Sequence, residues 1–443
     1  MNSTLSRSLK PVTARAPHYL QQPPAVVHGH HPEYRSPERP PPAAVGQVGN
    51  SQTPLERNQL RSDPPSQAGQ QQLLGLRITL VGPVPPPAGG MATQTRQLAE
   101  LLRGEQAEVL VVPTNTPYRP SWAGKVVGLR AICRLMPYLV ALWRAAASSD
   151  LFHVMANSGW SWHLFAAPAI WVGWLRGVPV VVNYRGGEAA SFLDRSQRLV
   201  RWSMRRAKSL AVPSRFLEKV FGQFGMRAEV VPNIIDLSRF FEAVEHAPNP
   251  TPHLIVTRNL EPIYDVETAL RAFALLRQSH TGARLTIAGS GPQEQRLLQL
   301  SQQLDVAASV HFAGRLDRDQ IAGLYREADI MLNSSVADNM PNSILESLAS
   351  GVPVVSTNVG GIPFLVEDGK TALLVAPRDP QALAHAAELL LDDPVLRHRL
   401  SSAGVEEAQR YTWERVRPVL TAVYRKALAE GSGPGSASRT EFR

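Results

Sequence analysis

The chain has 443 residues, 44% of them hydrophobic and 19% charged, which is enough apolar material for one or two sizeable cores. Global disorder is therefore excluded. The single cysteine, Cys133, excludes a disulfide within the chain and a zinc site built from cysteines, and it fits a reducing compartment. The net charge is uneven, with +3 over residues 1–72, +11 over 73–240 and −5 over 241–443.

Residues 1–72 differ in composition from the rest of the chain. They contain 12 of the 37 prolines, a run of glutamines, and no Trp, Phe or Ile. Such a segment buries too little apolar surface to offset the entropy of an ordered chain. We predict a disordered Pro/Gln-rich tail over 1–72. Because residues 1–10 lack the apolar run of a signal peptide, we expect a cytoplasmic protein.

From residue 76 onward, short apolar runs alternate with stretches that suit helices. A helix is expected over 93–102, and strands are expected at 77–81, 109–112, 151–155, 178–182, 210–212 and 229–231. The pattern restarts after Pro252. There a helix is expected over 265–276, and strands at 254–256, 285–288, 310–312, 330–332, 354–355 and 373–375.

Strand–helix alternation of this kind predicts an α/β protein with parallel, doubly wound sheets. We expect two Rossmann-like domains, 73–245 and 246–428, followed by a loose tail at 429–443. Ligands of open parallel sheets bind beyond the carboxyl ends of the strands. Two such domains facing each other therefore predict a cleft between them that holds the ligand.

The most apolar long segment, 164–182, is interrupted by Pro, Gly and Arg residues, which argues against a membrane-spanning helix. Two stretches mix basic and aromatic residues. One runs over 122–144, where Pro137 is expected to bend or break a helix, and the other over 198–208 around Trp202. They are either solvated helix faces or a surface for an anionic membrane. No nucleic-acid-binding motif is present.

Two glycine-rich loops follow predicted strands. Gly89 and Gly90 precede the first helix, where backbone N–H groups can approach a phosphate, and Gly289-Ser290-Gly291 follows the strand at 285–288. A tight turn is the alternative for each loop, and at 289–291 a strand-ending turn is the favoured one. His153 and His163 are candidates for contact with a substrate, although a structural role suits each of them better.

The segment 338–346 places two carboxylates around the start of a helix. Pro341 suits the first turn, Ile344, Leu345 and Leu348 form an apolar face with Glu346 off it, and Asp338 lies in the loop before the helix. Carboxylates accept hydrogen bonds from hydroxyls, and a helix N-terminus attracts phosphate, so this segment can hold a polyhydroxylated anion. The alternative is a capped surface helix with a solvated glutamate. A second acidic motif, Asp317-Arg318-Asp319, precedes another predicted helix, and we expect it to start that helix rather than to bind metal.

The sequence resembles the retaining, nucleotide-sugar-dependent glycosyltransferases of family 4, the group-1 family. Their signature is Glu-x7-Glu followed by a Gly-x-Pro-Val-Val strand, and this chain has Asp338-x7-Glu346 followed by 351–355. Further similarity lies in 289–292, in 231–236 and in the Gly89-Gly90 loop. The resemblance spans about 76–428 in consistent order.

The resemblance implies the GT-B architecture, in which the first domain holds the acceptor and the second holds the nucleotide sugar. It implies that Glu346 holds the ribose, Asp338 contacts the donor sugar and Arg258 binds the pyrophosphate. Further donor contacts are implied for Gly89, Gly90, Gly289, Met340, Pro341, Asn342 and Ser343. No metal and no cofactor are expected, with a nucleoside diphosphate sugar as co-substrate.

The chain departs from the family pattern at three places. No lysine follows Arg258 within 259–265, and the first signature carboxylate is Asp338 instead of glutamate. The usual His-Gly motif of the first domain is replaced over 183–188, where Arg185 takes the place of the histidine. We hypothesise that Arg185 supplies the missing cationic charge from the other side of the cleft. The alternative is that Arg185 fixes its loop by pairing with Glu188.

These observations predict a retaining, metal-independent hexosyltransferase-type enzyme that moves a sugar to a hydroxyl acceptor in surface polysaccharide or glycolipid biosynthesis. The expected partners are the nucleotide sugar, a glycan or lipid-linked glycan acceptor, and an anionic membrane surface, but not a nucleic acid. Peripheral association with the inner face of the membrane follows from that acceptor class. Two alternatives are a catalytically idle binding or partner subunit and, less favoured, a sugar-nucleotide epimerase.

Overall fold

A computed structural model describes residues 73–86, 89–116, 129–242 and 251–431. The predicted tail over 1–72 lies outside these ranges, as do Trp122 and Lys125 of the first basic–aromatic stretch and residues 432–443. The statements below concern the described residues.

The first domain is built on a six-stranded parallel sheet with the strand order β2-β1-β3-β4-β5-β6. All the expected strands of the first half are present, with bounds that differ from the expected ones by at most two residues; the largest difference is β4, which runs over Val180–Tyr184 instead of 178–182. The strands are β1 (Arg77–Gly82), β2 (Glu108–Pro113), β3 (Leu151–Ala156), β4 (Val180–Tyr184), β5 (Ser209–Val212) and β6 (Glu229–Val230).

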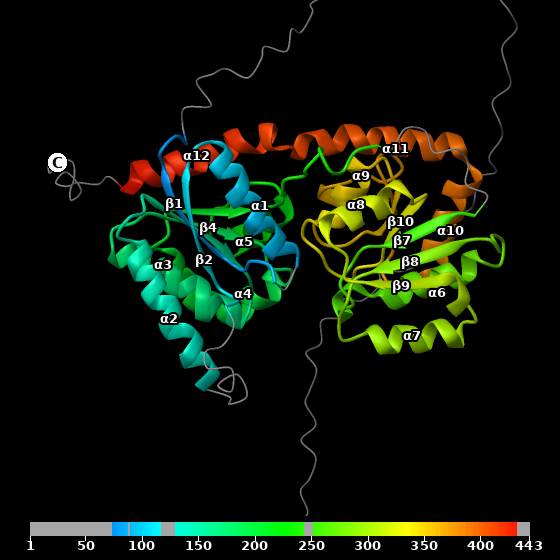
Figure 1. The fold of residues 1–443 in the computed structure, drawn as a ribbon, viewed down its shortest axis with the longest axis horizontal. Coiled ribbons are helices and arrows are strands. Elements are labelled where there is room, and N and C mark those ends of the chain that lie inside the picture. Colours follow the sequence, from blue (N-terminus) through cyan, green and yellow to red (C-terminus); the bar gives the residue numbers. More distant parts are fainter. Residues whose placement is uncertain (1–72, 87–88, 117–128, 243–250, 432–443) are drawn as a thin grey trace, which may run out of the picture. The chain divides into compact units, whose positions relative to one another are not determined.

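Helices cover both faces of this sheet (Figure 1). Because side chains alternate along a strand, Phe152 and Val154 of β3 pack on one face while Leu151 and Met155 pack on the other. Four helices cover the first face: α2 (Leu129–Ala145), α3 (Ala167–Leu175), α4 (Ala189–Met204) and α5 (Arg215–Gln223). The second face is covered by α1 (Gly90–Gly104) and α12 (Trp413–Gly431).

The last helix, α12, corrects two expectations. We expected 246–428 to belong to the second domain, but the buried side chains of α12 pack with α1 and the first sheet; they are Val416, Leu420, Val423, Tyr424 and Ala427. The helix also continues to Gly431, so residues 429–431 do not belong to a loose tail. The apolar stripe of α12 needs a partner, and the uncovered face of the first sheet provides it.

Pro137 does not break its helix. Helix α2 runs through it from Leu129 to Ala145. Tyr138 and Leu142, which follow the proline, are buried in the core of the first domain. Their burial offsets the hydrogen bond that the proline cannot make.

The second domain repeats the design with the strand order β12-β11-β10-β7-β8-β9, again all parallel. The expected strands are confirmed as β7 (His253–Val256), β8 (Arg284–Ala288), β9 (Val310–Gly314), β10 (Ile330–Asn333), β11 (Val354–Thr357) and β12 (Leu373–Val375). One face packs against α6 (Val266–Leu276), α7 (Glu294–Gln303) and α10 (Pro380–Asp392). The other packs against α8 (Arg318–Arg326) and α9 (Asn342–Ala349), while α11 (Pro394–Ala408) contributes to both cores.

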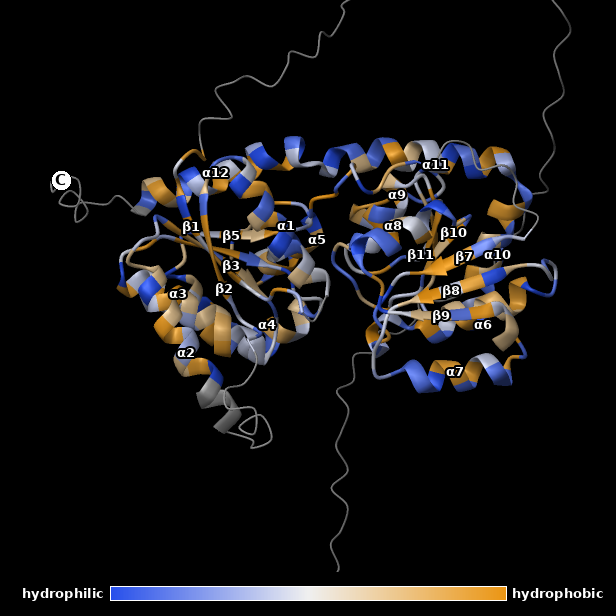
Figure 2. Cartoon of the chain, in the orientation of Figure 1, coloured by the Kyte–Doolittle hydropathy of each residue, from blue (hydrophilic) through white to orange (hydrophobic). Residues whose placement is uncertain are grey.

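Hydropathy follows this layering, since the strands are largely hydrophobic and many helices carry a hydrophobic stripe beside polar residues (Figure 2). The apolar segment 164–182 divides into the end of a π-helix (Trp162–Ala166), helix α3 and the start of β4. None of the helices in the described ranges is long and apolar enough to cross a membrane.

Each sheet has one point where chain connections leave in opposite directions. In the first sheet this point lies between the neighbours β1 and β3, and in the second between β7 and β10. Such switch points leave a crevice at the carboxyl ends of the strands, where ligands of doubly wound sheets bind. The segments following these four strands are therefore where a functional site is expected.

Candidate functional site

A pocket of about 390 Å³ is lined by segments that follow the strands of both sheets and by the N-terminal turns of α1 and α9. Every residue that the sequence singled out for catalysis or donor binding lines it. These residues are Gly89, Gly90, Arg185, Arg258, Gly289, Asp338, Met340, Pro341, Asn342, Ser343 and Glu346. The structure thus brings them together, and their roles remain predictions.

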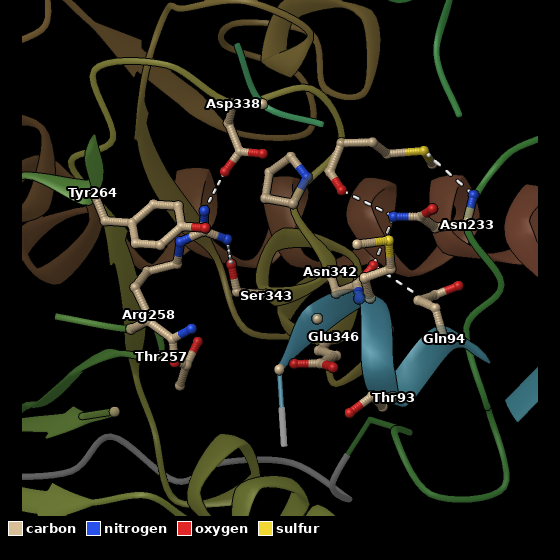
Figure 3. Close-up of a pocket in the computed structure, with 18 of the residues that line it drawn as sticks. Thr93, Gln94, Asn233, Thr257, Arg258, Tyr264, Asp338, Asn342, Ser343 and Glu346 are labelled. Carbon is tan, nitrogen blue, oxygen red and sulfur yellow. Dashed lines mark hydrogen bonds and ion pairs between the residues drawn. The ribbon is translucent and has the colours of Figure 1, made fainter. Parts of the chain in front are cut away.

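Arg258 lies two residues beyond β7 and is held from three directions (Figure 3). Its guanidinium pairs with the Asp338 carboxylate, and its Nη1 donates to Ser343 Oγ at 3.2 Å. Its guanidinium carbon lies 3.9 Å from the centre of the Tyr264 ring, a cation–π contact. The buried Nε has no hydrogen-bond partner among the described residues, so one donor is left for a ligand.

The loop that carries Asp338 is shaped by two glycines from another segment. The backbone N–H of Gly361 donates to the Asp338 carbonyl at 2.8 Å. A Cβ on Gly360 or Gly361 would overlap the carbonyl oxygens of Asp338 or Asn339, and Gly360 has a φ of +55°. Only glycine permits this close backbone approach, so the segment after β11 fixes the position of the carboxylate.

Glu346 lies one turn into α9, whose Ile344, Leu345 and Leu348 are buried as predicted. Burial raises the pKa of the Glu346 carboxyl to about 7, although Arg318, Arg258 and the Tyr325 hydroxyl oppose the shift. Tyr325 donates to Glu346 Oε2 over a long 3.4 Å. A carboxylate so weakly satisfied within the protein has accepting capacity left for hydroxyl groups of a ligand.

The two glycine loops differ in what requires the glycine. A Cβ on Gly289 would overlap the Arg258 carbonyl, and one on Gly291 would lie 2.5 Å from the Leu260 carbonyl, so packing explains both. Gly89 has extended backbone, and no atom lies within 4 Å of an added Cβ. Nothing among the described residues requires glycine at 89, which is compatible with close approach of a ligand to the start of α1.

Arg185 follows β4 and is surrounded by amide oxygens. Its Nε donates to Asn183 Oδ1 at 3.2 Å, and its Nη1 donates to Gln94 Oε1 at 3.3 Å and to Asn233 Oδ1. No carboxylate of the described ranges forms an ion pair with it, so the predicted alternative of a pair with Glu188 is wrong. Burial lowers the pKa of Arg185 to about 10, which leaves the side chain positively charged at neutral pH.

The amides around Arg185 also join α1 to α9. Asn233 Nδ2 donates to Asn342 Oδ1 at 2.7 Å and to the Met340 carbonyl at 2.9 Å, and Gln94 Nε2 donates to Asn342 Oδ1 at 3.2 Å (Figure 3). The sequence analysis did not assign a site role to Gln94, Asn233 or Tyr264. The only sequence signal near Tyr264 was the absence of a lysine within 259–265, which marked this segment as unusual.

Three other sequence candidates lie outside the pocket. Asp317 caps α8, because its side chain accepts from the N–H groups of Asp319 and Gln320 at 2.9 Å, as expected. His153 is fully buried, and His163 contacts the rings of Trp160 and Phe192. Neither histidine lines the pocket.

Two family models match consecutive parts of the chain. Residues 88–239 match the one described as Glycosyltransferase Family 4, and residues 239–407 match Glycosyl transferases group 1. Together they include every predicted site residue and every strand of the two sheets except β1.

Similar proteins with known names include a glycogen synthase from Mycobacterium tuberculosis, 27% identical over 390 residues that cover 79% of this chain and 94% of the relative. Among solved structures, sucrose-phosphate synthase from Thermosynechococcus elongatus superposes with a TM-score of 0.66 at 22% identity, covering 80% of this chain and all of that one. Anabaena Alr3699/HepE in complex with UDP-glucose gives 0.58 at 19% identity, covering 80% and 99%. These likenesses show the fold.

Proposed function

Because the chain belongs to the group-1 glycosyltransferases and has the GT-B fold, we propose that it is a retaining enzyme using a nucleoside diphosphate sugar. It transfers the sugar to a hydroxyl acceptor in surface polysaccharide or glycolipid assembly. No metal is needed for the chemistry in this proposal, since arginine side chains and helix N-termini carry the charge of the diphosphate.

The environment of Arg258 is the observation that carries the proposal. Its free Nε, the adjacent Ser343 hydroxyl and the start of α9 form a group of donors at the switch point between β7 and β10. That group suits a diphosphate. Glu346 lines the same pocket and suits the two ribose hydroxyls, and the resemblance assigns both residues these roles.

The chemical step breaks the bond between the sugar's anomeric carbon and the diphosphate oxygen, and forms one to the acceptor oxygen on the same face. The acceptor proton passes to the leaving phosphate, so no protein nucleophile is required. Negative charge grows on the diphosphate as the bond breaks. Arg258 stabilises that charge from the second domain, and Arg185, with no carboxylate partner, adds a cation from the first domain.

The test is binding and turnover with a panel of nucleotide sugars, beginning with UDP-glucose because a structural neighbour binds it. A donor should raise the melting temperature by mass action, and a sugar acceptor should then give a product with the donor's anomeric configuration by NMR. Inverted product would contradict retention. Binding without turnover for any acceptor would favour the idle-subunit alternative.

We also propose that the outer face of α2, α3 and α4 binds an anionic membrane. Trp143, Trp174 and Trp202 are each about half exposed, at 48%, 50% and 51%. Leu175, next to Trp174, and Leu199, three residues before Trp202, are also exposed. Arginines lie among them: Arg206 is 3.7 Å from the Trp171 ring centre and Arg176 is 4.8 Å from that of Trp143. Indole rings beside cationic groups suit the headgroup region of an anionic bilayer.

The paired substitution Trp174→Ser with Trp202→Ser should weaken binding to vesicles containing anionic lipid about tenfold, because apolar area that enters the interface is lost. Vesicle sedimentation measures this. The control pair, Leu298→Ser with Val395→Ser, removes exposed apolar side chains from the second domain and should leave binding unchanged. Equal losses in the two pairs, or equal binding to neutral vesicles, would refute a specific membrane face.

A further inference from the structure

A chain of buried side chains runs from Arg185 away from the pocket. Asn183 Oδ1 accepts from Arg185 Nε, and Asn183 Nδ2 lies 3.1 Å from His153 Nε2. On its other side, His153 Nδ1 lies 2.8 Å from the Tyr424 hydroxyl. Asn183 and Tyr424 are 1% exposed and His153 is 0%, so all three side chains are shielded from bulk solvent.

The directions of the hydrogen bonds in this chain follow from Arg185 at one end, and they persist only while the Tyr424 hydroxyl at the other end accepts from His153. A guanidinium only donates, so Asn183 must present its oxygen to Arg185 and its NH₂ to His153. Nε2 of His153 then accepts, which leaves the proton of the neutral ring on Nδ1, where it donates to Tyr424. Burial and the charge of Arg185 lower the pKa of His153 to about 3, consistent with a ring that stays neutral.

Tyr424 belongs to α12, the last helix, which the sequence placed in the other domain. Its ring meets that of His153 edge-on at 5.7 Å. Tyr424 thus packs from α12 against one face of the first sheet. From there the hydrogen-bonded chain continues through His153 and Asn183 to Arg185, which lines the pocket.

We propose that Tyr424 and His153 are positioning residues for Arg185. This proposal rests on the proposed function. In it, Tyr424 and His153 hold the guanidinium in the pocket by fixing the orientation of Asn183. Without the Tyr424 hydroxyl, the His153 proton can move to Nε2. Asn183 would then turn its NH₂ toward Arg185 Nε, and two donors would face each other. Arg185 Nε would lose its acceptor, and the guanidinium would be held only through Nη1 by Gln94 and Asn233, while the fold remained.

The main test compares Tyr424→Phe with Tyr138→Phe. Tyr138 is also buried in the first domain, donates to the Phe165 carbonyl at 2.7 Å and packs edge-on against a ring, but it does not contact the pocket. Both variants should lower the melting temperature by similar amounts. Only Tyr424→Phe should lower kcat, by about tenfold, with KM for the donor changed far less. Equal kcat in the two variants would overturn the proposal.

A double-mutant cycle tests whether Tyr424 acts through Arg185. Arg185→Ala should lower kcat at least as much as Tyr424→Phe, and the double variant should be no slower than Arg185→Ala alone. Additive losses would show that Tyr424 acts by another route, which overturns the proposal. Wild-type kcat in Arg185→Ala would instead contradict the proposed role of Arg185 in transfer.

A measurement without substrate separates a failure of the positioning proposal from a failure of the proposed function. Nitrogen-15 NMR of protein labelled at histidine and arginine should show His153 in the neutral Nδ1–H form, without titration between pH 5 and 9. In the same spectra, the Arg185 Nε–H signal should shift or broaden in Tyr424→Phe but not in Tyr138→Phe. An Nε2–H form, or an unmoved Arg185 signal, would overturn the positioning chain. Because no donor is involved, the result stands even where no nucleotide sugar is turned over.

Discussion

Replacement of Arg258 with alanine should lower kcat/KM for transfer from a nucleoside diphosphate sugar by about 10³-fold, the upper range for removing one donor that meets developing charge. The loss has two parts. The diphosphate loses its cation, and the Asp338 carboxylate, 13% exposed, loses its ion-pair partner in the pocket where an anion must bind. Steady-state kinetics with the best donor from the binding panel measures the loss.

The second part of this loss can be removed separately. In the double variant Arg258→Ala with Asp338→Asn, the unpaired carboxylate is gone, so kcat/KM should recover about tenfold relative to Arg258→Ala alone. Arg258→Lys keeps the charge but gives up the fork that reaches both Asp338 and Ser343 and the contact with Tyr264, so it should lie between wild type and alanine. Turnover of Arg258→Ala within threefold of wild type would remove Arg258 from the site.

Much of the fold could be predicted because the strands are buried on both faces. A strand in a doubly wound sheet has no polar face, so it appears in the sequence as a short apolar run between helices. The exception is informative: β4 extends through Asn183 and Tyr184, whose polar groups end the apolar run although both residues are buried. Asn183 is buried because it holds Arg185, which no local pattern could indicate.

The meeting of Arg258 and Asp338 could be predicted only in part. Both follow strands that the topology places side by side, β7 and β10, so their common location follows from the switch point. Their direct pairing depends on a third segment, since Gly360 and Gly361 hold the Asp338 loop in place. Contacts between segments remote in sequence leave no mark on the spacing within any one of them.

The sequence analysis did not identify the neutral amide side chains of the site, for a different reason. Gln94 and Asn233 orient Arg185 and Asn342, yet side chains of this type are common on protein surfaces and have no characteristic spacing. The packing of α12 was missed similarly. Its apolar stripe predicts that it covers something, but the stripe does not indicate which of two sheets it covers.

Donor affinity should depend on pH through Glu346. With its pKa at about 7 in the unliganded protein, the carboxyl is largely protonated below that pH. A ribose whose hydroxyls donate to the carboxylate requires the charged form, so binding below pH 7 must also remove the proton. Because one proton is involved, the Kd for the donor should rise about tenfold per pH unit below 7 and be level above 8.

Stability should change in the opposite sense. The folded pKa lies above the unfolded value of 4.5, so the folded state binds more protons between these pH values, and stability falls as pH rises from 4.5 to 7. The glutamine variant has no charge to bury. Glu346→Gln should therefore be more stable than wild type at pH 8 by about 3 kcal/mol, and the difference should vanish near pH 4.5. Thermal or urea unfolding across this range measures it.

The same substitution thus separates binding from folding. At pH 8, Glu346→Gln should bind the donor about 100-fold more weakly than wild type, because two hydrogen bonds from the ribose would go to a neutral acceptor instead of a charged one. The Kd of the variant should also no longer depend on pH between 5 and 8. Glu406→Gln, at an exposed position on α11, serves as the control and should change neither property. A glutamine variant that keeps the wild-type pH slope would show that another group titrates. A glutamine variant that binds the donor normally would show that Glu346 does not hold the ribose. If binding is weak, misfolding is not the cause, because the variant is expected to be more stable than wild type.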